Sequence, residues 1–109
     1  MVSLREDRGL RLVPVRKITH IQSEENYSRV HLADARPALV RRSMAEWEQV
    51  LPKEKFLRAE RSLIVPLASV REVKPESRDV ARVVLAGQTQ PLTLARRASL
   101  RIRQALDAR

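Results

Sequence analysis

The sequence predicts a mostly β domain in which short antiparallel strands are combined with two α-helices, one mid-chain and one C-terminal. Three observations lead to this fold class. The chain has 109 residues, a length that suits one domain with one core. Most of its apolar segments are short and alternate with polar residues, as half-buried strands do. Only two segments repeat apolar residues at helical spacing, and the short turns between the others favour antiparallel pairing.

The first third of the chain is predicted to form strands. We expect a flexible segment over residues 1–9 and the folded domain over residues 10–109. A short strand around Pro14 opens the domain, and Ile18–Ile21 forms a second one. The alternation is clearest over Tyr27–Leu32, where successive side chains would lie on opposite faces of a sheet.

The first helix follows a turn at residues 34–37 and a partner strand at residues 38–40. Ser43 and Glu46 have the spacing of a capping box, in which each side chain bonds a free backbone N–H of the other residue. Pro52 ends the helical pattern. The apolar residues of this helix are Met44, Trp47, Val50 and Leu51, and we expect Trp47 to lie in the core.

The remaining chain is predicted to form strands and one last helix. A strand pair within residues 56–67 is interrupted by the polar residues 58–62. Further on, the pattern predicts a strand at residues 70–73, a hairpin with strands at 80–85 and 90–94, and a helix from Ala98 onwards.

The charge of the chain favours a polyanionic partner. Lys and Arg number 22 against 13 Asp and Glu, which gives a formal charge of +9. Each phosphate that such residues neutralise releases a condensed counterion. Arginine predominates over lysine, and its guanidinium grips phosphate or guanine in bidentate fashion. A genome rich in G and C would produce the same preference for arginine, so the net charge is the stronger indication.

Several classes of function lack the residues they need. There is no cysteine, and His20 and His31 have no carboxylates at metal-ligand spacing, so we expect no metal site. No serine has a credible His and Asp pairing, and two glycines cannot supply a P-loop. We therefore predict a protein that is not an enzyme and needs no cofactor. No apolar run approaches the roughly 18 residues of a membrane span, which favours a cytoplasmic protein without membrane contact.

Four motifs occur in a fixed order along the chain. They are ITHIQSEENYSRV (18–30), VRRSM (40–44), FLRAERSLIV (56–65) and PLTLARR (91–97). With these motifs, residues 10–106 resemble the LytTR family, the DNA-binding output domain of many bacterial response regulators. The F-x-R-x-x-R-S-x-I-V string is the most specific of the four.

The resemblance implies an elongated stack of small antiparallel sheets whose loops, not a recognition helix, enter successive major grooves of double-stranded DNA. The family's DNA-contacting positions fall in three loops. They map onto Asn26 and Ser28, onto Arg61 and Ser62, and onto Arg96 and Arg97. Three more candidates come from the sequence itself: Ser43 as a phosphate site at a helix N-terminus, and Arg41 and Arg42 beside it as phosphate contacts.

Each candidate has a plainer alternative. Arg61, the best candidate for a guanine contact, could instead pair with Glu60 or Glu24. Ser28 could form a cross-strand hydrogen bond, and Ser43 could act as a helix cap alone. Arg41 and Arg42 could form a solvated sheet edge. Of Arg96 and Arg97, which we expect just before the last helix, one could pair with an acid.

Three residues depart from the family pattern. Glu60 stands where the family usually has histidine, Pro66 where it commonly has asparagine, and Ala95 where a serine usually precedes the arginine pair. A carboxylate at position 60 would repel a nearby phosphate. We expect these changes to alter sequence preference and affinity for DNA more than the fold.

The predicted partner is double-stranded DNA with tandem half-sites, on which the domain would pair as a dimer and regulate transcription. In this family the domain commonly follows a phosphorylated receiver or a membrane segment, and neither lies in these 109 residues. Two alternatives remain open: an RNA-binding module, which the three aromatic residues disfavour because single-stranded RNA is bound by stacking, and a basic protein-interaction module.

Overall fold

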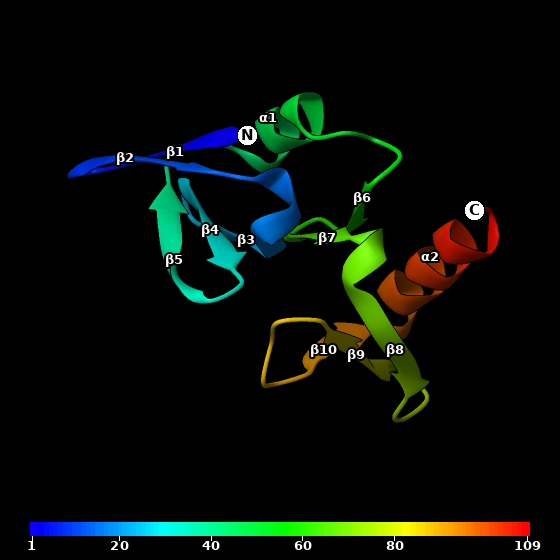
Figure 1. Ribbon diagram of the computed structural model, residues 1–109. Helices are drawn as coiled ribbons and strands as arrows, with labels where there is room; N and C mark the ends of the chain where they lie inside the picture. Colours follow the sequence, from blue (N-terminus) through cyan, green and yellow to red (C-terminus); the bar gives the residue numbers. More distant parts are fainter.

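The computed structural model describes residues 1–109 and confirms a mostly β fold with two α-helices, one mid-chain and one C-terminal (Figure 1). The strands are β1 (Val2–Glu6), β2 (Gly9–Val13), β3 (Ile18–Glu24), β4 (Tyr27–Leu32), β5 (Ala35–Val40), β6 (Phe56–Glu60), β7 (Leu63–Pro66), β8 (Val70–Pro75), β9 (Val80–Leu85) and β10 (Leu92–Ala95). The helices are α1 (Met44–Val50) and α2 (Arg96–Asp107).

Three antiparallel sheets make up a molecule of 43 × 26 × 25 Å. The central sheet has five strands in the order β5-β4-β3-β7-β6. The hairpin β1–β2 lies against β5, and a three-stranded sheet, β10-β9-β8, lies at the other end beside α2 (Figure 1). All pairings except β3–β7 join consecutive strands in antiparallel fashion, as the spacing of the apolar segments predicted.

Strand β7 separates two hydrophobic cores. All four of its residues are buried, because both of its faces are covered. Ile64 lies in the first core with Trp47, and its neighbours Leu63 and Val65 lie in the second core with Ile102. The turn between β6 and β7 is therefore followed by a strand that packs into both cores.

Trp47 is the centre of the first core. It is completely buried between α1 and the central sheet, as its place in the helical pattern predicted. Its Nε1 donates a hydrogen bond of 2.7 Å to Ser28 Oγ, which in turn donates to the carbonyl oxygen of Val40 at 3.3 Å. The helix begins with the predicted capping box of Ser43 and Glu46.

The loop between β9 and β10 fastens the three-stranded sheet to the central one. Gly87 has a φ of +83°, and a Cβ atom built on it would lie 3.3 Å from Thr19 Cγ2. Both the backbone conformation and the close approach therefore favour glycine. The next residue, Gln88, donates from Nε2 to Thr19 Oγ1 at 2.9 Å. Two sheets that share no strand are joined at this point.

Two expectations about the ends of elements were wrong. Residues 1–9 do not form a flexible segment, because Val2–Glu6 pairs with Gly9–Val13 and Leu4 is fully buried in the first core. The last helix begins at Arg96 and not at Ala98, so Arg96 and Arg97 form its first turn. No helix has the length and apolar character to cross a membrane.

Candidate nucleic-acid interface

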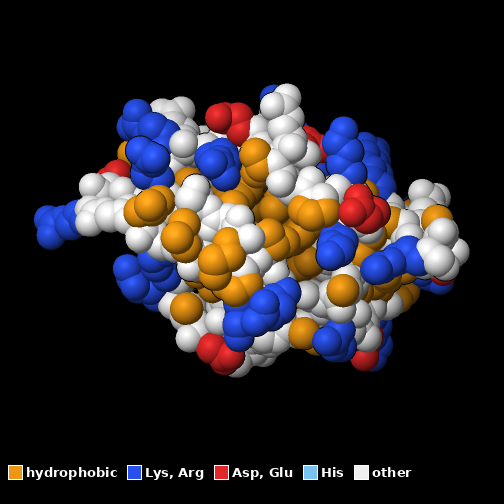
Figure 2. Space-filling view, turned by 45° about the horizontal axis from the view of Figure 1, so that its top comes forward, with side chains coloured by type: hydrophobic (Ala, Val, Ile, Leu, Met, Phe, Trp, Pro, Cys, Tyr) orange, Lys and Arg blue, Asp and Glu red, His pale blue; other side chains and the backbone are white.

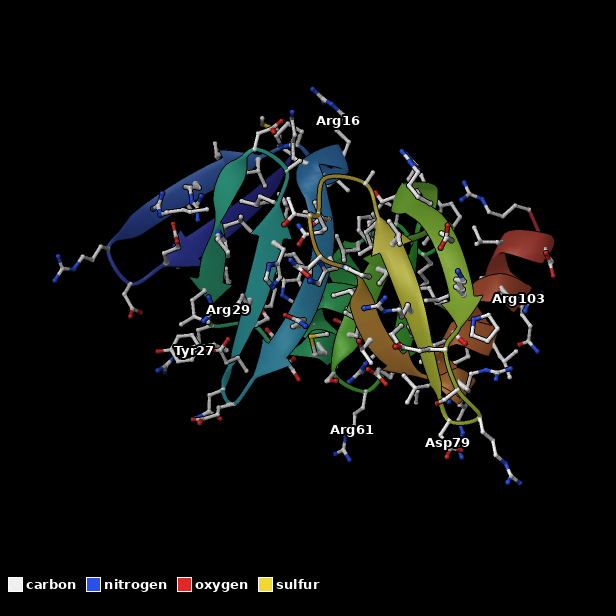
Figure 3. The ribbon with its side chains drawn as sticks, turned by 90° about the horizontal axis from the view of Figure 1, so that it is seen from below. Arg16, Tyr27, Arg29, Arg61, Asp79 and Arg103 are labelled. Carbon is white, nitrogen blue, oxygen red and sulfur yellow. The ribbon has the colours of Figure 1, made fainter.

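The turns that carry the predicted site residues lie along one edge of the molecule. Figure 3 shows Tyr27 at the β3–β4 turn, Arg61 at the β6–β7 turn and Asp79 at the β8–β9 turn on this edge, whereas Arg16 projects from the opposite edge. Arg61 points away from the ribbon into solvent (Figure 3). We call this the turn edge.

Two open hollows lie side by side on the turn edge and share Arg61. The first, of about 730 Å³, is lined by Asn26, Tyr27, Arg41, Arg42, Ser43, Arg58, Arg61 and Ser62, among others. The second, of about 660 Å³, is lined by Glu60, Arg61, Asp79, Ala95, Arg96, Arg97, Ala98 and Arg101. Each hollow contains four arginines against two carboxylates, so each has an excess of positive charge. Of the predicted site residues, all but Ser28 line one hollow or the other.

The β6–β7 turn is held by Arg58. Its Nε and Nη2 donate to the carbonyl oxygen of Arg61 at 3.2 and 2.8 Å, and its Nη1 donates to Glu48 Oε1 at 2.8 Å. The turn is thus tied to helix α1. The backbone N–H of Ser23 also donates to the carbonyl oxygen of Ser62 at 3.0 Å, which ties the turn to β3.

The side chain of Arg61 itself is free. Its guanidinium makes no ion pair, and the two acids considered as alternatives are not bound to it. Glu24 instead pairs with Arg29 at 2.6 Å, and this hydrogen-bonded pairing lowers the pKa of the Glu24 carboxyl. All five guanidinium N–H groups of Arg61 therefore remain available to a ligand.

Arg41 and Arg42 both rest on aromatic rings. The Arg41 guanidinium lies 5.2 Å from the ring centroid of Tyr27 and donates to its hydroxyl at 3.1 Å. The Arg42 guanidinium lies 4.6 Å from the ring centroid of Trp47. Such cation–π contacts fix the charge in place without neutralising it. Nη1 of Arg42 is buried and has no hydrogen-bond partner, so this side chain retains an unused donor beside the first hollow.

Ser43 is committed to the helix cap. Its Oγ accepts from the N–H of Glu46 at 3.1 Å, and its own N–H donates to Glu46 Oε1 at 2.9 Å. These hydrogen bonds lower the pKa of the Glu46 carboxyl, which stays ionised and occupies the helix N-terminus. Ser43 therefore acts as a helix cap, the alternative considered above, and its exposed side chain also lines the first hollow, so a phosphate contact at Ser43 stays a prediction.

Ser28 does not reach the turn edge. Its side chain is completely buried, and its hydroxyl is occupied by Trp47 and Val40. The assignment of Ser28 to the interface is therefore corrected in favour of the alternative, a hydrogen bond within the core. Ser28 points into the core because side chains alternate along a strand, and those of residues 28, 30 and 32 lie on the buried face of β4.

The first turn of α2 supplies the arginines of the second hollow. The backbone N–H of Arg96 donates to the carbonyl oxygen of Asp79, and its Nη1 donates to the carbonyl oxygen of Ser77 at 3.1 Å. Arg101 Nη1 donates to the carbonyl oxygen of Ala59 at 2.9 Å, which ties α2 to β6. Arg97 is exposed and makes no ion pair with an acid.

Tyr27, Arg58, Asp79 and Arg101 also line the two hollows but were not among the predicted site residues. Tyr27 lies beneath Arg41, and its hydroxyl accepts a hydrogen bond from it. Arg58 belongs to the F-x-R-x-x-R-S string, and that motif was the signal for it. Asp79 and Arg101 reach the second hollow through the folding of distant segments, for which the sequence offers no signal.

Comparisons with known proteins agree with this geometry. The family model of the LytTr DNA-binding domain matches residues 8–107. A similar solved structure is the LytTr DNA-binding domain of a Bacillus cereus protein described as a methyl-accepting/DNA response regulator. It has a TM-score of 0.81 and 21% identity, over 96% of this chain and 94% of that chain, and supports the fold. No curated protein matches the sequence. Because the family model covers residues 8–107 of 109, the chain belongs to the LytTR DNA-binding domain family.

Proposed function

We propose that this DNA-binding domain recognises a specific double-stranded sequence by inserting the turns of the turn edge into the major groove, and that it regulates transcription in this way. Arg61 carries the proposal, because it is unpaired, projects from the turn edge and lines both basic hollows. A single duplex lying along this edge would meet the arginines of both hollows.

The dimensions of the molecule agree with contacts in successive grooves. Its longest extent is 43 Å, and one turn of B-DNA rises about 34 Å. Turns at separate points along such a molecule can enter one major groove and the next on the same face of a duplex. Base contacts by loops of a β scaffold need no recognition helix.

We assign the guanidinium groups to two roles. Arg61 and Arg96 contact base edges, where a guanidinium donates in bidentate fashion to guanine O6 and N7. Arg41, Arg42 and Arg97 contact phosphates, which position the domain on the duplex without selecting its sequence. Asn26 and Ser62, both exposed at the first hollow, add neutral hydrogen-bonding groups.

We further propose that two copies occupy tandem half-sites about 10 base pairs apart, so that both lie on one face of the DNA. A receiver or sensor domain joined to this one would control how often the two copies meet on DNA. Mobility shifts on duplexes with one and two half-sites test the pairing, since paired copies bind the double site cooperatively.

Selection of bound duplexes from a random pool is the experiment that tests the function. We expect a defined consensus, and a steep fall in affinity for the selected duplex as salt rises, because bound phosphates release counterions. Equal binding to every duplex would contradict sequence-specific recognition. Stronger binding to a matched RNA would favour the RNA-binding alternative. Absence of any salt-sensitive binding to nucleic acid would favour an acidic protein partner.

Arg61→Ala is expected to relax specificity. The variant should lose about 1–3 kcal/mol of binding free energy on the selected duplex and much less on a scrambled one, because a base contact has been removed. Fluorescence anisotropy with both duplexes measures the two affinities. Arg16→Ala is the matched control, since Arg16 is also exposed and unpaired but lies on the opposite edge. An equal loss in both variants would mean that Arg61 contributes only its charge.

Arg58→Met is expected to weaken binding through the turn that carries Arg61. Methionine retains much of the apolar stem of Arg58 but removes its three hydrogen bonds to Arg61 and Glu48. The turn therefore gains conformational entropy, and this entropy is lost again when the turn binds DNA. We expect faster amide hydrogen exchange at Ser23, whose N–H donates to the carbonyl oxygen of Ser62, and weaker binding to the selected duplex. Glu48→Gln keeps the bonds to the turn and should have a smaller effect. Unchanged exchange at Ser23 would contradict this role.

A further inference from the structure

Glu60 occupies an unusual place in the second hollow. It is the last residue of β6 and directly precedes Arg61. It also lines a third, neighbouring hollow with Gln22, Ser23 and Ser62, next to the β6–β7 turn. A negative charge thus lies in the hollow that contains Arg61, Arg96 and Arg97, three of the arginines that the proposed DNA contacts require.

The carboxylate of Glu60 is free. The chain has two half-buried carboxylates, Glu6 and Glu60. Glu6 is paired with Arg11 at 2.9 Å, whereas Glu60 has neither a hydrogen bond nor an ion pair. Glu60 therefore offers free acceptor oxygens to a ligand that supplies hydrogen-bond donors.

Three arginines near Glu60 are engaged elsewhere, whereas Arg97 and Arg61 are free. Arg58 binds Glu48 and the carbonyl oxygen of Arg61, and Arg101 binds the carbonyl oxygen of Ala59. Arg96 uses one amino group on the carbonyl oxygen of Ser77. The hollow therefore presents a free acceptor at Glu60 directly beside the free donors of Arg61.

We propose that Glu60 is a specificity-determining residue that accepts a hydrogen bond from the exocyclic N4 amino group of cytosine, at a base pair next to the guanine contacted by Arg61. This inference rests on the proposed function. In the major groove a carboxylate pairs with cytosine N4, whereas it repels a phosphate and the acceptor-only edge of guanine. Glu60 thus adds a penalty for wrong bases to the attraction that Arg61 supplies.

The selected consensus and the variants Glu60→Ala and Glu60→Gln test this proposal. Glutamine keeps the shape but removes the charge. We expect wild type to prefer cytosine at one position by about 5- to 150-fold over thymine, the range that corresponds to one lost base contact. In Glu60→Ala, which removes the acceptor, this preference should fall below about threefold. Glu60→Gln should retain part of the preference, because its amide oxygen still accepts from cytosine, while binding to a scrambled duplex becomes stronger in both variants because phosphate repulsion is removed.

Glu54→Gln is the matched control, because Glu54 is an exposed glutamate that lines none of these hollows. It should leave the consensus unchanged. If Glu60→Ala selects the same consensus as wild type while Arg61→Ala still relaxes it, the inference about Glu60 is overturned and the proposed function stands. If wild type itself selects no consensus, both fail.

Discussion

Replacing Trp47 by alanine is expected to lower the free energy of unfolding by about 3–5 kcal/mol, the usual cost of truncating a large buried aromatic side chain. Trp47 is fully buried in the first core, where it also bonds Ser28 and supports the Arg42 guanidinium. The truncation therefore creates a cavity, leaves a buried hydroxyl without its donor and frees Arg42. Urea denaturation followed by circular dichroism measures the loss.

Trp47→Phe separates packing from hydrogen bonding at this site. Phenylalanine fills most of the space but cannot donate to Ser28 Oγ, so we expect a smaller loss of about 1–3 kcal/mol. A loss below about 1 kcal/mol in the alanine variant would contradict the central place of Trp47 in the core. Val50→Ala, at an exposed position of the same helix, should change stability little.

Acidification from pH 6.5 to about 4 is expected to remove about 3 kcal/mol of stability through His20. Burial, together with repulsion from His31, lowers the pKa of His20 from 6.5 to about 4. The unfolded chain takes up a proton below pH 6.5, whereas folded His20 stays neutral down to about pH 4. Stability is therefore fully present above pH 6.5 and falls as the pH drops through this window.

The geometry around His20 explains why it resists protonation. Its ring stacks on that of His31 at 4.0 Å between centroids, and its Nδ1 lies 3.2 Å from Thr19 Oγ1. Burial also lowers the pKa of His31, so acidification removes further stability through this residue. Protonation of either ring would place a positive charge against its stacked neighbour.

Urea denaturation at several pH values, in wild type and in His20→Gln, measures this effect. Glutamine does not titrate, so the variant should be less stable at pH 7 but lose much less on acidification to pH 4.5. The ionised carboxylates Glu6, Glu24 and Glu46, whose pKa values are lowered from 4.5, affect stability mainly below that pH, and they do so in both proteins. Parallel curves for wild type and variant between pH 6.5 and 4.5 would contradict the assignment to His20.

Local signals in the sequence were sufficient to predict most elements of this fold. The alternation over Tyr27–Leu32 and Val80–Leu85 reproduces the bounds of β4 and β9, and the capping box marks the start of α1. Where prediction failed, tertiary contacts decide the structure. Residues 2–6 form a strand because Leu4 enters a core assembled from distant segments, which no local pattern reveals.

The sequence was sufficient to predict which residues belong to the candidate site, but not which hydrogen bonds and ion pairs they form. Arg61, Arg96 and Arg97 lie together at the second hollow, as the order of motifs indicated. The alternation of residues 27–32 places Ser28 on the same face as Val30 and Leu32, but its hydrogen bond to Trp47, 19 residues away, could not be read from the sequence. Arg58 stands in a motif beside Arg61, but its bridge to Glu48 on α1 arises only when helix and sheet meet.

On a surface with this much positive charge, net charge alone does not locate an interface. Figure 2 shows Lys and Arg side chains around the rim of a face whose middle is largely hydrophobic, so basic residues are spread beyond the turn edge. Three arginines of the turn edge are held in place without an acidic partner, Arg41 and Arg42 by aromatic rings and Arg96 by a backbone carbonyl group, while Arg61 remains free. Because these side chains are already ordered, they lose less conformational entropy when the domain binds DNA.

Amide chemical shifts recorded by NMR during titration with the selected duplex test most directly whether a single edge of this molecule contacts DNA. The largest changes are expected at Asn26, Arg61, Ser62, Arg96 and Arg97, with little change at Arg16 and Asp34. Changes concentrated at Arg16 and Asp34, with Arg61 and Arg96 unaffected, would contradict the interface described above.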